Sequence, residues 1–397
     1  MEIPIVRPEL GEEEVRAVAK VIRSGWIAQG PEVAAFERDL GDAVHAPHAV
    51  AVSSCTAALE LCLRALGVGL DDDVVTVSHS FIATANAVVA VGARPIFVDI
   101  DPVTYGMDAS LLEAALTEKT RAILCVHQLG FPCDLPAILD IAGRRKIPVI
   151  EDAACAIGSE IHFAGKWQRI GRPHGLAACF SFHPRKIITT GDGGMITTAD
   201  EALAARLRLL RQHAMTVGGT LKHESQRVTF ESFVEPAYNF RMTDMQAAMA
   251  RPQLARLGEI VAMRRLLADR YHTELAGHPA LSPPQEPIWM RANFQSYPLR
   301  IRPDGRLSQI QIMQHLLDHG VASRRGVGNA HAEPAYRNLG WSCGPEPCDE
   351  KLHGEGTCLR LTHSTEARDG TVMIPLFHGM TEAEQSHVIA TLKNLRP

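Results

Sequence analysis

The sequence has few aromatic residues, no long hydrophobic run and no block of basic charge. Aromatic residues make up 5% of the 397 residues, and 40 lysines and arginines stand against 45 aspartates and glutamates, a net charge of −5. An acidic chain without a basic face argues against nucleic-acid binding. The apolar runs stay well below the roughly 20 residues that a membrane helix needs, so we expect no membrane span.

Signals for secretion and for a disulfide scaffold are also missing. Residues 1–10 contain no basic stretch followed by a long apolar one, which is not the pattern of a signal peptide. The nine cysteines show no regular pairing pattern, as is typical of a reducing compartment. We therefore expect a cytoplasmic protein.

Two common nucleotide-binding motifs are absent as well. The chain has no Walker-type glycine-lysine-serine/threonine loop, and Gly191–Gly194 leads into an apolar run that predicts a strand rather than a helix. These observations argue against a phosphate loop and against a dinucleotide turn.

What the sequence does contain is a regular alternation of short apolar runs and amphipathic stretches. Over about 150 residues, this alternation predicts an α/β fold with a mostly parallel sheet and helices on both faces. Strands are predicted at 49–52, 74–77, 95–98, 121–126, 148–150, 177–182 and 195–198, and helices at 11–24, 32–44, 57–66, 81–91, 109–116, 136–144 and 200–213.

The length predicts two domains. Pro252 lies inside a helical pattern and should kink it, so we expect a large domain at 1–252 and a smaller α+β domain at 253–397. Residues 215–235 are polar and irregular and predict an ordered loop or a mobile flap. Elements predicted beyond the boundary are a helix at 253–275, a strand at 295–301, a helix at 308–318 and a final helix at 381–395 with a capping box.

Polar residues follow several of the predicted strands: Ser53–Thr56, Ser78–Ser80, Glu151–Asp152 and Ser181–Lys186. Ligands of such sheets bind at the carboxyl ends of the strands, so these residues indicate one site. Ser53–Thr56 lead into a helix, which predicts an anion site at its N-terminus or, alternatively, a simple helix cap.

Lys186 lies between two apolar runs and precedes a glycine-rich stretch. A lysine there is a candidate nucleophile for a Schiff base, and the alternative is an exposed lysine on a hairpin. Asp152 follows a buried strand and is a candidate partner for the pyridine nitrogen of pyridoxal phosphate, whereas the alternative is a turn-forming aspartate.

The ordered set of motifs resembles the DegT/DnrJ/EryC1/StrS family of pyridoxal-phosphate-dependent aminotransferases, which have the fold type I architecture and act mainly on nucleotide-linked keto sugars. The resemblance covers nearly the whole chain and implies a large domain with a seven-stranded type of sheet and a smaller C-terminal domain. It rests on Glu151–Ala154, Ser181–Lys186 with Gly191–Gly194 behind it, Ser53–Leu59, Phe81–Asn86, Gly92–Asp101, Tyr238–Asp244 and Ile374–Thr381.

The resemblance implies a role for each matching residue. Lys186 would hold the cofactor as a Schiff base and move the proton, and Asp152 would face the ring nitrogen. Other implied contacts are Phe81 stacked on the ring, Cys55, Thr56 and Ser181 at the phosphate, Cys155 near the ring at a position where the family often has glutamine or histidine, and Asn239 reaching the phosphate from a neighbouring subunit. A homodimer with shared active sites follows from the last of these.

Substrate contacts are less specific. Arg324, Arg325 and His331 lie in a loop that borders the substrate site in part of the family, and the arginines are candidates for a nucleotide diphosphate. The alternative is a set of solvated arginines. His183 is a candidate substrate contact or a packed histidine, and Arg241 is a candidate for the cofactor phosphate or an acidic substrate group.

Cys343, Cys348, His353 and Cys358 follow one another at intervals of five residues. Four such ligands in one loop are compatible with zinc, but the spacing is wider than that of a zinc knuckle and the family does not call for a metal. We therefore expect ordinary loop thiols and no metal.

Together these observations predict an aminotransferase that works in two half-reactions. Glutamate would convert the cofactor to pyridoxamine 5′-phosphate, and the amine would pass to a 4-keto- or 3-keto-6-deoxy sugar linked to a nucleotide. The alternatives are an aminotransferase for keto-cyclitols or other small ketones of an antibiotic pathway, and a non-enzymatic regulatory protein that keeps only the fold.

Overall fold

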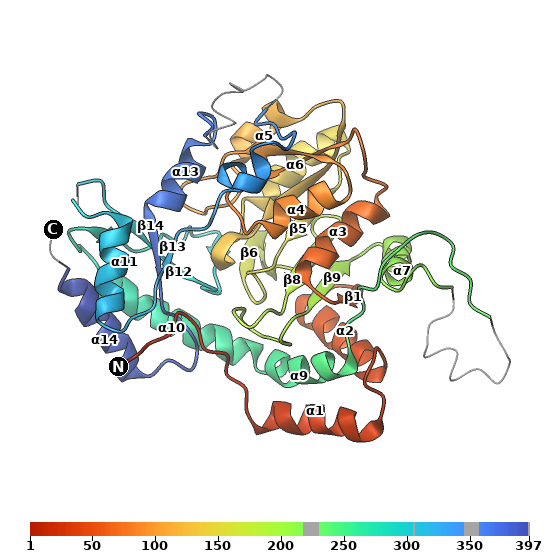
Figure 1. Ribbon diagram of the computed structural model, residues 1–397, viewed down its shortest axis with the longest axis horizontal. Helices are drawn as coiled ribbons and strands as arrows, with labels where there is room; N and C mark the ends of the chain where they lie inside the picture. The colour runs from red at the N-terminus through yellow and green to blue at the C-terminus, as the bar shows by residue number, and fades with distance from the viewer. Residues whose placement is uncertain (217–229, 305, 345–356, 396–397) are drawn as a thin grey trace.

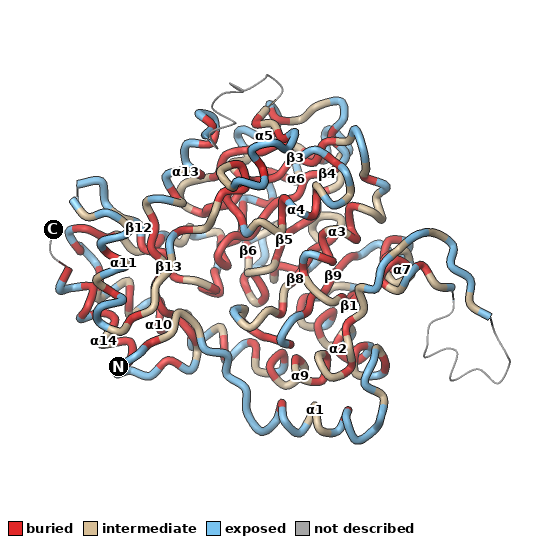
Figure 2. The backbone as a smooth tube through the Cα atoms, in the orientation of Figure 1, coloured by how far each residue is buried: buried red, intermediate tan, exposed pale blue. Residues whose placement is uncertain are grey.

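The computed structural model describes residues 1–216, 230–304, 306–344 and 357–395. Figure 1 shows a large central sheet flanked by helices and a smaller sheet with α10, α11 and α14 beside it. The strands of the large sheet form the buried centre of the molecule, whereas exposed backbone concentrates in loops and outer helices (Figure 2).

The large sheet has seven strands in the order β1-β9-β8-β5-β4-β2-β3. Every strand but β9 runs in the same direction, and β9 is antiparallel to both β1 and β8. The predicted mostly parallel α/β sheet is therefore confirmed. The strands are β1 (His48–Val52), β2 (Asp73–Val77), β3 (Arg94–Val98), β4 (Thr120–Val126), β5 (Val149–Asp152), β8 (Ala177–Ser181) and β9 (Gly194–Thr198).

Four of the helices that flank this sheet, α3, α5, α6 and α7, begin at a capping side chain. Ser54, Asp108, Asp134 and Asp200 each accept a hydrogen bond from a backbone N–H of the first helical turn. The helices are α2 (Pro31–Val44), α3 (Cys55–Ala65), α4 (Ala83–Ala90), α5 (Ala109–Ala115), α6 (Leu135–Arg145) and α7 (Glu201–Leu210).

A hairpin that the sequence did not predict follows β5. β6 (Glu160–Phe163) and β7 (Lys166–Arg169) pair with each other, and β6 also pairs with β11 (Met290–Arg291). These strands are short and contain polar and apolar residues in no regular order. They therefore lack the clear alternation of apolar residues that marks a half-buried strand.

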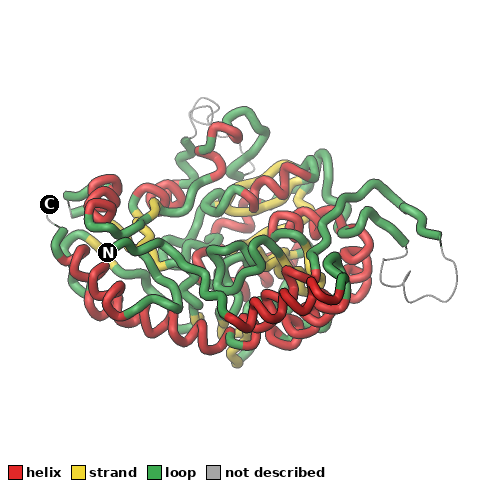
Figure 3. Tube along the Cα trace, turned by 60° about the horizontal axis from the view of Figure 1, so that its bottom comes forward, coloured by secondary structure: helices red, strands yellow, loops and turns green. Residues whose placement is uncertain are grey.

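The helix predicted to kink at Pro252 does not end there. α9 (Asp244–Ala255) continues past the proline, and the break falls at Arg256, before α10 (Leu257–Glu274). The predicted position of the break was therefore wrong by a few residues. α1 (Glu12–Ser24) packs along α9. In the turned view of Figure 3, helices line the lower side of the molecule and strands lie behind them.

The C-terminal part contains an antiparallel sheet in the order β10-β12-β14-β13. Ser308 and Thr381 form the capping boxes of α11 and α14, which confirms the box predicted at the final helix. The elements are β10 (Leu281–Ser282), β12 (Tyr297–Ile301), β13 (Arg324–Arg325), β14 (Thr371–Ile374), α11 (Gln309–Asp318), α13 (Thr362–Asp369) and α14 (Glu382–Lys393).

The N-terminal strand segment lies beside this smaller sheet. The Ile3 N–H donates to the Gly320 carbonyl over 2.8 Å, and the Ala322 N–H donates to the Ile3 carbonyl over 2.9 Å. Figures 1 and 3 both place the N-terminus on that side of the molecule. The division at 252/253 stays a prediction, to which the structure adds that the first residues pack against the C-terminal part.

Among the described residues, helices long and apolar enough to cross a bilayer are absent. The segment predicted as a loop or flap at 215–235 lies in large part outside the described residues.

Candidate active site

The carboxyl ends of the parallel strands bring the predicted site segments to one edge of the sheet. β9 runs in the opposite direction, so its first residue, Gly194, lies at this edge between Val52 of β1 and Ser181 of β8. A Cβ atom on Gly194 would lie 2.5 Å from the Ser54 carbonyl carbon and 2.7 Å from the Cys55 nitrogen. Only glycine allows the start of β9 to approach α3 so closely.

Lys186 lies beside Cys155 at this edge. The Lys186 Nζ donates to the Cys155 Sγ over 3.0 Å. Burial disfavours the ammonium, but Cys155, Cys55 and Asp152 favour it, and the balance raises the pKa of Lys186. The structure thus brings together four of the residues that the sequence predicted for the site.

The loop that carries Lys186 is fixed by hydrogen bonds from two sides. The Lys186 N–H donates to the His183 carbonyl over 2.8 Å. On the other side, the Gln253 side chain of α9 accepts from the Thr189 N–H over 2.9 Å and donates to the Thr189 carbonyl over 2.8 Å. Lysine side chains lose much entropy when ordered, so a fixed backbone helps to place the amine.

Asp152 is buried at the end of β5, with the Cys55 Sγ 4.0 Å from Oδ1 and two closer donors. The Thr84 hydroxyl of α4 donates to Oδ2 over 2.7 Å, and the Ala154 N–H donates to Oδ1 over 3.1 Å. Ser80 lies 2.7 Å from the Thr84 hydroxyl and extends this chain. Burial raises the pKa of Asp152, whereas Thr84, Ala154 and the Lys186 charge act in the opposite direction. A buried carboxylate of this kind is stabilised by a positively charged partner.

The N-terminus of α3 provides donors for an anion. Ser54 caps the helix by accepting from the Ala57 N–H over 3.1 Å, and the earlier N–H groups of the first turn have no intrahelical partner. Cys55 is buried, with Sγ 3.5 Å from the Cys179 carbonyl, and burial raises the pKa of its thiol well above the ordinary value. Thr56, the second residue of α3, is exposed.

These residues fit pyridoxal phosphate, which carries an aldehyde, a basic ring nitrogen and a phosphate. Lys186 offers the amine, Asp152 the buried carboxylate for the ring nitrogen, and the start of α3 the N–H groups for the phosphate. Phe81 lies just before α4 with 74% of its surface exposed, although an aromatic side chain is stabilised by covering. Its exposed side chain is a candidate to stack on the cofactor ring.

Basic residues surround the loop of Lys186. Burial lowers the pKa of His183, and the charges of Arg185, Lys186 and Arg324 lower it further, against the effect of Asp192. Within the described part of the chain, neither Arg185 nor Arg324 has a carboxylate within ion-pair distance, whereas Arg325 contacts Glu333 at 3.5 Å.

The other residues predicted for substrate or phosphate lie in different surroundings. His331 is fully buried, its Nδ1 lies 2.6 Å from the Ser78 hydroxyl, and its ring contacts Trp341, which favours a structural role. Asn239 is exposed and accepts from the Arg241 N–H over 3.3 Å. Contacts of Asn239, Arg241 and His331 with a ligand stay predictions.

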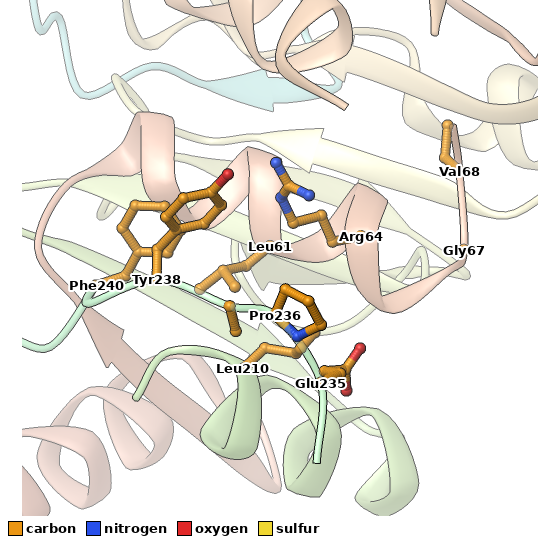
Figure 4. A pocket seen from close by; sticks show the side chains of 10 residues that line it. Leu61, Arg64, Gly67, Val68, Leu210, Glu235, Pro236, Tyr238 and Phe240 are labelled. Atoms are coloured by element: carbon orange, nitrogen blue, oxygen red, sulfur yellow. The ribbon is translucent and has the colours of Figure 1, made fainter. Parts of the chain in front are cut away.

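The segment that carries Asn239 packs on the outside of α3. The Phe240 carbonyl accepts from the Ser53 N–H over 2.8 Å, which ties this segment to the end of β1. Figure 4 shows the residues that line a hollow beside this segment, among them Arg64 and Tyr238. The hollow has a volume of about 170 Å³, and the Arg64 guanidinium lies 5.2 Å from the centre of the Tyr238 ring. This hollow does not include Lys186 or Asp152.

Of the four residues considered for zinc, Cys343 is disulfide-bonded and Cys358 is buried. Cys348 and His353 lie outside the described residues. A disulfide-bonded sulfur is not a thiolate ligand, which argues against the zinc alternative.

Sequence reasoning missed Thr84, Gln253 and Asn293. Asn293 is fully buried and donates to the Cys155 carbonyl over 2.9 Å, which holds the turn after Asp152. Thr84 follows Phe81 by three residues, so helical spacing places both at the same end of α4 and offered a signal. Gln253 and Asn293 act across long sequence separations, and no local pattern indicated them.

Comparison with known proteins places this site in a family. The family model of the DegT/DnrJ/EryC1/StrS aminotransferases matches residues 8–393. The aminotransferase TlmJ from Streptoalloteichus hindustanus is 31% identical, with a TM-score of 0.85 and 98% of each chain covered. The putative sugar aminotransferase Spr1654 from Streptococcus pneumoniae, solved in PMP and PLP forms, is 28% identical with a TM-score of 0.87, over 99% of this chain and 97 to 98% of that chain.

A third similar structure is DesV from S. venezuelae, solved with a ketimine intermediate. It is 30% identical, with a TM-score of 0.84, and covers 99% of this chain and 98% of its own. The match to the family model leaves out only a few residues at each end. The chain therefore belongs to the DegT/DnrJ/EryC1/StrS aminotransferase family, whose cofactor is pyridoxal phosphate.

Proposed function

We propose that this aminotransferase moves an amino group from glutamate to the keto group of a 4-keto- or 3-keto-6-deoxy sugar linked to a nucleotide. The observation that carries the proposal is the convergence of Lys186, Asp152 and the start of α3 at one sheet edge. Sugar as the acceptor class is supported by relatives named sugar aminotransferases, among them CalS13 from Micromonospora echinospora.

Pyridoxal phosphate, when bound, supplies the carbonyl that joins an amine and a ring that withdraws electrons from the reacting carbon. Lys186 would hold the cofactor and would carry the proton at Nζ once its amine is free. Asp152 would keep the ring nitrogen protonated, because a buried carboxylate gains from a neighbouring positive charge. Phe81 would stack on the ring, and Cys55, Thr56 and Ser181 would bind the phosphate.

The basic residues beside the Lys186 loop support acidic substrates. The charges of Arg185 and Arg324 both lower the pKa of His183, and both residues are candidates for an acidic substrate group. Glutamate carries two carboxylates and a nucleotide sugar carries a diphosphate, both of which pair well with guanidinium groups. Arg325, whose partner Glu333 lies 3.5 Å away, and Arg241 are further candidates for the diphosphate.

We propose that the enzyme works as a homodimer in the cytoplasm. Asn239 is exposed on a segment that also exposes Phe233, Val234 and Tyr238. In a dimer this segment would be covered, and Asn239 would reach the phosphate of the neighbouring site. Mixing an Asn239→Ala chain with a Lys186→Ala chain tests the sharing. If the sites are shared, both changes fall in one site of the mixed dimer and the other site is intact. If they are not shared, each site carries one change and neither is intact.

The absorption spectrum of the purified protein tests the reaction. We expect the pyridoxal band to convert to the pyridoxamine band on addition of glutamate, and a matching nucleotide keto sugar to restore it. Lys166→Ala, a change on an exposed strand, is the matched control for Lys186→Ala. If the pyridoxal band persists in glutamate, the assignment of the donor is refuted. If no nucleotide keto sugar restores the band, the assignment of the acceptor is refuted.

A further inference from the structure

Cys155 differs from the other cysteines in the described residues, because it is partly exposed and they are all buried. Its sulfur accepts the hydrogen bond from the Lys186 Nζ over 3.0 Å. A thiol and an amine are therefore in contact at a place that solutes can reach. The mechanism proposed above uses the amine and leaves the thiol without a task.

The backbone around this pair is fixed on both sides. The Cys155 carbonyl accepts from the Asn293 side chain over 2.9 Å, and the Lys186 N–H donates to the His183 carbonyl over 2.8 Å. The lysine side chain, with its flexible four-carbon stem, supplies the small movement that closes the gap to sulfur. Bond formation then needs no rearrangement of the fold.

We propose that Cys155 and Lys186 form an oxidation-sensitive pair in which peroxide links the two side chains through a sulfur–nitrogen bond. Hydrogen peroxide oxidises the Cys155 thiol to a sulfenic acid and is reduced to water. The Lys186 ammonium gives one proton to the sulfenic hydroxyl, the amine so formed attacks the sulfur, and the S–O bond breaks with release of water. A further proton goes to solvent, and the product is a sulfenamide that a small thiol reduces back to the free pair.

The consequence is control over cofactor loading. A linked Lys186 has no amine for the cofactor, so the oxidised protein cannot take it up, whereas cofactor bound through Lys186 protects the pair. This protection rests on the proposed function, but formation of the link in the cofactor-free protein does not. The neighbouring Cys55 is a poorer target because it is buried, with its sulfur 3.5 Å from the Cys179 carbonyl.

Mass spectrometry of the full-length, cofactor-free protein tests the proposal. After treatment with hydrogen peroxide we expect the mass to fall by two hydrogens and a peptide with Cys155 to be joined to one with Lys186, with both changes reversed by dithiothreitol. Lys186→Gln should instead leave a Cys155 sulfenic acid that dimedone labels, and Cys155→Ser should show neither product. Urea unfolding of both variants checks that they are folded.

Two results would overturn the proposal. One is dimedone labelling of Cys155 to the same extent in the wild type and in Lys186→Gln without a joined peptide. The other is a disulfide between Cys55 and Cys155 in place of the sulfur–nitrogen link. Unoxidised protein is loaded with pyridoxal phosphate in parallel: if it fails to load, the proposed function is refuted, whereas loading without any link in the oxidised sample refutes only the redox pair.

Discussion

Removal of the Thr84 hydroxyl tests how the buried Asp152 is kept ionised. Thr84→Val keeps the shape of the side chain and deletes the donor that lies 2.7 Å from Oδ2. A hydrogen bond to a charged group contributes about 1.5 to 3 kcal/mol, so the variant should lose about 2 kcal/mol of unfolding free energy while Asp152 is ionised. Thr84→Ser, which keeps the hydroxyl, is the control.

The sign of the pH dependence follows from the pKa. Burial raises the pKa of Asp152 in the folded protein, and loss of the Thr84 donor raises it further. The deficit of the variant is therefore present above the folded pKa, where the carboxylate is charged, and shrinks as pH falls and the carboxyl becomes neutral. Urea unfolding of cofactor-free protein over a series of pH values, from about pH 8 downward, measures how the deficit changes.

The same change should slow the glutamate half-reaction. A more basic Asp152 takes a larger share of the proton from the ring nitrogen, and about 2 kcal/mol corresponds to a rate roughly 30-fold lower if the full effect reaches the transition state. An equal stability deficit at all pH values would show a packing defect instead. No deficit at the higher pH values would refute the account of Asp152.

Three further predictions concern stability and cofactor binding. Arg264 is fully buried and donates to the Phe294 and Leu376 carbonyls. We expect Arg264→Met to lower the free energy of unfolding by about 3 kcal/mol, and Arg270→Met, at a half-buried site, to lower it by much less. Equal losses in urea unfolding would contradict this. Burial lowers the pKa of His79 to about 4, so the unfolded chain binds the proton at a higher pH than the folded protein does. The free energy of unfolding should therefore fall by up to about 3 kcal/mol as pH drops from 6.5 to 4, and a His79→Gln variant should lose less over that range. An unchanged midpoint of acid unfolding in the variant would refute the assignment. Phe81→Ala should weaken cofactor binding by up to about tenfold. The stability of the protein should not change, because the Phe81 ring is exposed. Titration of cofactor-free protein with the cofactor measures the dissociation constant, and an unchanged value would argue against stacking.

The fold was predictable because burial leaves a periodic trace in the sequence. The strands of the large sheet are short apolar runs bounded by polar residues, and the helices begin at capping residues such as Ser54 and Asp200. The hairpin of β6 and β7 lacks such a trace, since Ile161 is the one fully buried residue of its two strands. Tertiary pairing with β11 determines it, and pairing across about 130 residues is not visible locally.

The site was predictable where chemistry coincides with strand ends. Asp152 is the last residue of β5 and Lys186 lies in the loop after β8, so the parallel topology brings them together. Thr84, by contrast, acts on Asp152 across 68 positions, and Gln253 acts on Thr189 across 64. Hydroxyl and amide side chains are common in helices, and only the packed structure shows which of them meet a buried partner.

The cofactor anchor is the central claim, and chemical trapping tests it most directly. Protein loaded with pyridoxal phosphate is reduced with borohydride, digested and mapped by mass spectrometry, with the exposed Lys166 as an internal reference. We predict a stable pyridoxyl group on Lys186 and none in the Lys186→Ala variant. A pyridoxyl group on another lysine of the wild type, with Lys186 unmodified, would contradict the account.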